Sequence, residues 1–152
     1  MKYSRQLSIL FFAVLLITAV ACGKKNGEEN TPPPTTSSLD DKGVGPVKSL
    51  TLVALDPSLA SKGQQLFQSR CSVCHKIEEK FVGPALKAVT QRRSPEWILN
   101  MILNPQEMTQ KDPVAHELLA IHYVQMTFQN VTQEDARSIL EFFRQNDSQL
   151  PK

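Results

Sequence analysis

Apolar residues recur along most of the chain at the spacing of an amphipathic α-helix, and prolines and capping residues divide this pattern into segments. Asp56, Ser94 and Asp112 can each cap a helix, and each is followed by a proline at the first helical position. Thr132 with Asp135 three residues later resembles a capping box. The first predicted helix spans residues 57–68, and a second, short helix follows Pro84. The third begins at Pro95 and is stopped by Pro105. The last two span residues 113–122 and 133–145. No strand alternation competes with them, so we predict an all-α domain.

The same periodicity predicts which helix faces are buried. The inward residues are Leu59, Leu66 and Phe67; Leu86 and Val89; Trp97, Ile98, Met101 and Ile102; and Ala136, Ile139, Leu140 and Phe143. The domain spans residues 56–147, which is enough for one modest core. Residues 76–83 and 104–112 are predicted loops. A buried cofactor would give loops of this length something to pack against.

The first 22 residues have the pattern of an export signal. Lys2 and Arg5 give a positive start, and an apolar run of 14 residues follows from Leu7 to Val20. A membrane-spanning helix needs about 20 apolar residues, so this run fits the core of a signal peptide better. It ends in small residues directly before Cys22.

This ending, Ala19-Val20-Ala21-Cys22, resembles the lipobox of bacterial lipoproteins. The resemblance implies that the signal peptide, residues 1–21, is cleaved and that lipid is attached to Cys22. A plain secretory signal that leaves Cys22 as a free thiol and an uncleaved single-span anchor are the alternatives. All three place the remaining chain outside the cytoplasm, and the lipoprotein interpretation predicts a membrane-anchored protein that faces the periplasm.

Charge and composition narrow the function classes further. The net charge of +2 comes from Lys2 and Arg5 of the signal, so the mature chain is neutral, which gives no basis for nucleic-acid binding. Residues 22–55 are polar and rich in proline, so we predict a flexible, lipid-anchored tether. Within it, Ser49–Leu55 could form a short strand or pack on the domain. Residues 148–152 are a short tail.

The motif that carries chemistry is Cys71-Ser72-Val73-Cys74-His75. In such a C-x-x-C-H segment the two thiols can add to the two vinyl groups of a porphyrin and the imidazole can bind its iron, which is the attachment pattern of haem c. A thioredoxin-like dithiol, half of a zinc site and a structural disulfide are the alternatives. The chain shows no βαβ pattern for the first and no second pair of zinc ligands for the second. One covalent haem is therefore the predicted cofactor.

His75 supplies one axial ligand, and the other has several candidates. Those in the mature chain are Met101, Met108, Met126, His116 and His122. Met101 falls on an apolar helix stripe and is expected to pack in the core, and Met108 lies in a predicted loop. Met126 lies 51 residues after His75, which is enough chain to reach the opposite face of the haem. We predict Met126 as the second iron ligand and the two histidines as surface or ordinary residues that do not bind the iron.

Together these features resemble a class I monohaem cytochrome c of the bacterial lipoprotein type, over residues 59–144. Gly63-x-x-Leu66-Phe67 is similar to the family's first helix, and Val82-Gly83-Pro84-Ala85-Leu86 to its Gly-Pro-x-Leu element. Met126 and the helix after it match the family's distal ligand and last helix, although Thr127 stands where the family often has proline. The implied fold is a small cytochrome c fold with about five helices around one haem.

The resemblance also implies roles for individual residues. In the family, the first and last helices cross, which would bring Gly63 and Phe67 against Phe142 or Phe143. The carbonyl of Pro84 would accept a hydrogen bond from His75.

Two further contacts with the cofactor follow from the same resemblance. Trp97 would bind a haem propionate, with Arg92 or Arg93 near it. The similarity extends to cytochrome c domains associated with nitrous-oxide reductase, which points to denitrification.

The predicted function is electron transfer rather than catalysis. The partners would be redox proteins, namely a respiratory donor and a terminal reductase or oxidase as acceptor, and the chain would be a monomer. The first alternative is a haem enzyme or a gas or peroxide sensor with a labile sixth ligand. The second is a haem-free lipoprotein that uses Cys71 and Cys74 as a dithiol.

Overall fold

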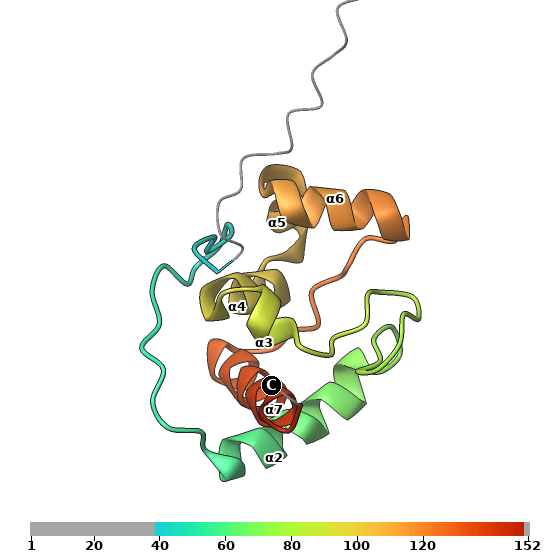
Figure 1. Ribbon diagram of the computed structural model, residues 1–152. Helices are drawn as coiled ribbons and strands as arrows, with labels where there is room; N and C mark the ends of the chain where they lie inside the picture. The colour runs from blue at the N-terminus through green and yellow to red at the C-terminus, as the bar shows by residue number, and fades with distance from the viewer. Residues whose placement is uncertain (1–38, 151–152) are drawn as a thin grey trace, which may run out of the picture. The chain divides into compact units, whose positions relative to one another are not determined.

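The computed structural model describes residues 39–150 as an all-α unit, and within that range it contains no strand (Figure 1). The elements in order are α2 (Pro57–Leu66), the π-helical turn η1 (Phe67–Cys71), α3 (Val89–Arg92), α4 (Pro95–Leu103), α5 (Pro105–Lys111), α6 (Pro113–His122) and α7 (Gln133–Ser148). The predicted fold class is confirmed. The predicted signal peptide and Cys22 lie outside the described residues. Within the described residues, no helix has the length and apolar character that crossing a membrane requires.

The predicted capping residues begin the helices as expected. The Asp56 carboxylate accepts bonds from the first turn of α2, Ser94 Oγ accepts one from Trp97 N at 3.0 Å, and Asp112 caps α6. Thr132 and Asp135 form the reciprocal bonds of a capping box at the start of α7. These local signals define most helix starts because the acceptor lies within a few residues of the N–H groups that it satisfies.

The centre of the fold is the crossing of α2 and α7, which lie against each other in Figure 1. Gly63 makes the crossing possible, because a Cβ at this position would lie 1.9 Å from the backbone oxygen of Ser138. The Phe67 ring packs against Phe142 and Phe143, with ring centroids 5.4 and 5.8 Å apart. The predicted aromatic contact is therefore confirmed, whereas Gly63 itself meets the α7 backbone.

Residues 104–112 were predicted to be a loop, and this prediction is wrong. Pro105 ends α4 but also begins α5, since proline is well tolerated in the first turn of a helix. The side chain of Lys111 pairs with Glu107 one turn earlier at 2.7 Å. Met108, which lies on α5, is fully buried, so this helix contributes to the core.

Residues 39–50, the N-terminal strap, pack against α4 and α5. Asn100 holds the strap with three hydrogen bonds of 2.9 Å, from its amide nitrogen to the carbonyls of Lys42 and Val47 and from Val47 N to its amide oxygen. Val47 is 3% exposed and belongs to the core. Within the described range this differs from the flexible tether predicted for residues 22–55. Residues 51–55 form no strand and are mostly exposed.

Candidate cofactor site

An apolar cavity of about 190 Å³ lies among η1, the segment after the C-x-x-C-H motif, α4, the end of α6 and α7. Its apolar walls include Phe67, Leu86, Val89, Ile98, Ile139 and Phe143. A water molecule occupies only about 30 Å³ of liquid, so the space suits a larger, apolar guest. Several of the lining residues, Cys74 and Val124 among them, are exposed, so the cavity reaches the surface.

The two motif cysteines line this cavity, Cys74 exposed and Cys71 partly buried. The π-helical turn η1 ends at Cys71, and the backbone N–H groups of Cys74 and His75 both donate to the Cys71 carbonyl, at 3.1 and 2.9 Å. Both thiols are free, so the structure does not support the disulfide alternative. Burial raises the pKa of the Cys71 thiol, which keeps this side chain neutral. Both sulfur atoms are available to a group that fills the cavity.

His75 is fixed by the segment predicted to hold it. Its Nδ1 lies 3.3 Å from the carbonyl oxygen of Pro84, which can only accept, so Nδ1 carries the proton and Nε2 keeps its lone pair. Gly83 lies directly against the ring, because a Cβ there would be 2.4 Å from His75 Cε1. Burial lowers the pKa of His75, although the Pro84 bond opposes this effect. A neutral imidazole with a fixed tautomer can bind a metal ion.

Met126 lines the same cavity from the Met126 loop, residues 123–131. Gln125 fixes the loop: its amide nitrogen donates to Met126 O at 2.9 Å, and its amide oxygen accepts from the Thr109 hydroxyl at 2.9 Å. Arg70 donates to Gln129 O at 3.0 Å from the other side. Sequence reasoning missed these positioning residues, because α5, which carries Thr109, was predicted to be a loop.

The other ligand candidates separate clearly. Met101 lines the cavity from α4, but Met108 is enclosed by the strap, where Val44 N lies 2.9 Å from its Sδ. His116 is exposed, whereas His122 lines the cavity, a position that the prediction of surface or ordinary histidines did not distinguish. The spacing of Ala115, Leu118, Leu119 and His122 could have revealed this difference, since these residues form one helix face.

Trp97, which was predicted to contact the cofactor, lines the cavity. Its Nε1, however, donates to Asp112 Oδ1 at 3.2 Å, so the structure gives this proton a protein acceptor instead of leaving it for a propionate. Arg93 lies over the Trp97 ring, 5.3 Å from its centroid. Arg92 also lines the cavity and donates to two backbone carbonyls of the 85–87 segment.

These residues fit a haem that is bound through Cys71 and Cys74. The cavity is apolar, the two cysteines line it, and His75 presents a neutral nitrogen. Among the described residues no group of three or more histidine, cysteine or acidic side chains could hold a metal ion by itself, which argues against the zinc alternative.

Comparison with known proteins agrees with this assignment. The family model for cytochrome c matches residues 60–147. The chain is 37% identical over 62 residues to a "Cytochrome c-553-like" protein of Synechocystis and 44% identical over 43 residues to the cytochrome c-551 of Stutzerimonas stutzeri. These matches cover 39% and 28% of this chain, and only 59% and 41% of the length of these two curated relatives.

A solved structure gives a longer match. The cytochrome c from Rhodothermus marinus is 43% identical, with a TM-score of 0.68, and the match covers 70% of this chain and 92% of that one. At this identity the likeness extends beyond the general helical architecture.

Proposed function

The chain belongs to the cytochrome c family and carries one covalently attached haem c, and from this premise we propose that it is an electron carrier tethered to a membrane outside the cytoplasm. When bound, the haem iron supplies a one-electron couple between Fe(II) and Fe(III). Cys71 and Cys74 would hold the porphyrin through thioether bonds. The observation that carries the proposal is the pair of free thiols beside an imidazole that is held by Gly83 and Pro84 at an apolar cavity.

The proposed axial ligands explain transfer without catalysis. His75 and Met126 would fill both axial positions of the iron and leave no site for a substrate. Methionine ligation and an apolar pocket both stabilise the ferrous state and raise the potential. The Pro84 carbonyl keeps the His75 ring in one tautomer, and Gln125 keeps the Met126 loop against α5. Both ligands would therefore change position little when an electron arrives or leaves.

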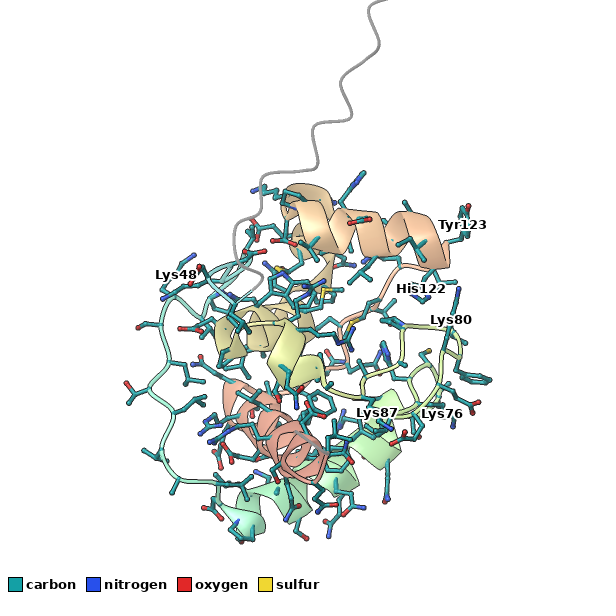
Figure 2. All side chains as sticks on the ribbon, viewed as in Figure 1. Lys48, Lys76, Lys80, Lys87, His122 and Tyr123 are labelled. Atoms are coloured by element: carbon teal, nitrogen blue, oxygen red, sulfur yellow. The ribbon has the colours of Figure 1, made fainter. Side chains whose placement is uncertain are left out.

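The surface beside the cavity opening suits a transient redox partner. Large apolar side chains that line the cavity or are adjacent in sequence to lining residues are exposed: Val73, Phe81, Tyr123, Val124 and Phe128. Figure 2 shows Lys76, Lys80 and Lys87 on the same side of the molecule as Tyr123 and His122. Glu78 pairs with Lys87 at 2.6 Å, so local charge is partly cancelled. We propose an apolar docking contact of under ~1,200 Å² with a few lysines at its edge.

The anchor and the pathway complete the proposal. Lipid on Cys22 would keep the carrier at the membrane surface, and residues 23–38 would let it reach several partners there. The proposed donor is a respiratory complex, and the proposed acceptor is a terminal reductase or oxidase. The nitrous-oxide reductase of denitrification is the acceptor that the sequence resemblance suggests.

Mass spectrometry of protein isolated from membranes tests the cofactor and the anchor in one measurement. The expected mass corresponds to the chain from Cys22 onward with one haem and lipid added. A chain without haem would refute the electron-carrier proposal. Haem without lipid would refute only the anchor.

The axial ligands have their own test. The ferric wild-type protein should show the charge-transfer band of methionine ligation, and the Met126→Ala variant should lose it. A spectrum of the variant that matches wild type would exclude Met126. Rapid carbon monoxide binding by the ferrous wild-type protein would instead favour a haem enzyme or a gas sensor.

A further inference from the structure

His122 is the residue at the site that the electron-transfer proposal leaves without a role. It ends α6, and its ring lines the cavity that also contains His75 and Met126. Its Nδ1 is buried and has no hydrogen-bond partner within residues 39–150. Such an atom loses its bonds to water and gains nothing in exchange, so it calls for an explanation. In Figure 2, His122 lies below the end of α6 on the side of Lys80, whereas Tyr123 points away from the molecule.

His75 and His122 line the same cavity. Burial is the main cause of the lowered pKa of His75, and positive charge on His122 lowers it further. Imidazole nitrogen is a good ligand for iron. The cavity therefore contains a second imidazole besides that of His75.

The loop that carries Met126 is held less firmly than His122. In the described part of the chain, residues 124–131 make no backbone-to-backbone hydrogen bond, and side chains such as Gln125, Thr109 and Arg70 hold them instead. His122 lies on the last turn of a helix whose backbone bonds continue to Tyr123 N. Segments with few backbone bonds open at a lower free energy than helices, so the Met126 loop is expected to open before α6 does.

We propose that His122 is a built-in replacement ligand for the haem iron, which binds when the Met126 sulfur leaves. This inference rests on the proposed function, since it requires the haem and ligation by Met126. In the exchange, the bond from the thioether sulfur breaks and a bond from an imidazole nitrogen forms, while the iron keeps its oxidation state. Methionine ligation raises the reduction potential of haem iron, so loss of the methionine lowers it. The exchange would therefore switch the carrier to a form that holds the ferric state more strongly.

Variants in the Met126→Ala background test this directly. We expect Met126→Ala to retain a low-spin ferric haem with two nitrogen ligands, and Met126→Ala/His122→Ala to become high-spin. The matched control, Met126→Ala/His116→Ala, removes an exposed histidine of the same helix and should behave like Met126→Ala. Added imidazole should bind the His122→Ala double variant at least tenfold more tightly than Met126→Ala, because no internal ligand competes. A high-spin Met126→Ala, or a low-spin His122→Ala double variant, would overturn the proposal.

A second measurement leaves Met126 in place. On warming below the unfolding transition, the ferric wild-type protein should lose its methionine band and stay low-spin, whereas His122→Ala should become high-spin as the band fades. Identical behaviour of the two proteins would contradict the proposal. The haem mass and the low-temperature methionine band of the wild-type protein test the proposed function separately. If either is absent, the proposed function fails; if both are present, a negative result in these experiments concerns His122 alone.

Discussion

Replacing Gly63 by alanine tests the helix crossing on which the cofactor site depends. The added Cβ would lie 1.9 Å from Ser138 O and 2.4 Å from Ser138 C, whereas ordinary van der Waals contact begins at 3.4 Å. The neighbour on α7 is backbone, so no side-chain rotation can relieve the clash. The two helices must therefore separate by about 1.5 Å at this point.

The free-energy cost has opposing contributions. Forcing an extra methyl group into a packed interface costs about 1–3 kcal/mol, with backbone clashes at the upper end. Separation also weakens the contacts of Phe67 with Phe142 and Phe143, and such aromatic pairs contribute about 0.5–1.5 kcal/mol each. Alanine returns about 1 kcal/mol through its higher helix propensity. We expect Gly63→Ala to lower the free energy of unfolding by about 2–4 kcal/mol.

Urea unfolding of the haem-loaded protein, followed by circular dichroism, measures this difference. At about 4–8 °C for each 1 kcal/mol in a small domain, the melting temperature should fall by at least about 8 °C. Ser61→Ala, at an exposed position of the same helix, is the matched control and should change stability by less than about 0.5 kcal/mol. A Gly63→Ala variant as stable as this control would refute the packing argument.

Three further predictions concern the site and the strap. Gly83→Ala should push the His75 ring from its place and weaken its bond to iron, which lower haem retention and an altered ferric spectrum would show; a normal spectrum would contradict the close contact. Asn100→Ala should detach the N-terminal strap and cost about 2–4 kcal/mol in urea unfolding, because three hydrogen bonds are lost in a buried setting; proteolysis confined to residues 39–50 would locate the change. Burial opposes the charge on Glu96, but its own N–H, the N–H of Leu50 and the charge of Lys42 outweigh burial and hold the pKa of Glu96 below the ordinary value of 4.5. The free energy of unfolding should therefore fall as the pH drops from about 4.5 through this lower pKa. Urea titrations at several pH values should show a smaller fall for Glu96→Gln.

Local signals explain why most of the helices could be predicted from the sequence. The caps at Asp56, Ser94 and Asp112 act on N–H groups two or three residues away, so the sequence contains both partners within one turn. The Cys71–His75 motif is equally local. Pro105 shows the limit of this reasoning, since proline ends one helix and begins another, and only packing decides that a second helix follows.

Long-range contacts explain what could not be predicted. The strap is fixed by Asn100, which lies 53 positions after its partner Val47. A polar segment without periodicity gives no sign in the sequence of such a distant partner. The bond from Trp97 to Asp112 has the same origin: Trp97 lies in α4 and Asp112 lies between α5 and α6, so the course of the chain through α5 brings the carboxylate to the indole. The prediction of a propionate contact did not take the carboxylate of Asp112 into account.

The two histidines of α6 show how a site residue can be missed even when its signal is local. A helix advances about 100° per residue, so residues 116 and 122, six positions apart, lie about 120° apart around the helix axis and point to different faces. Ala115, Leu118 and Leu119 define the inward face, and His122 continues it at the next turn. A histidine on an apolar stripe that faces a cofactor cavity differs chemically from one on the exposed side. Comparing His122 with His116 in the same helix therefore separates the effect of position from the effect of residue type, which is why that pair is the control for the proposed ligand exchange.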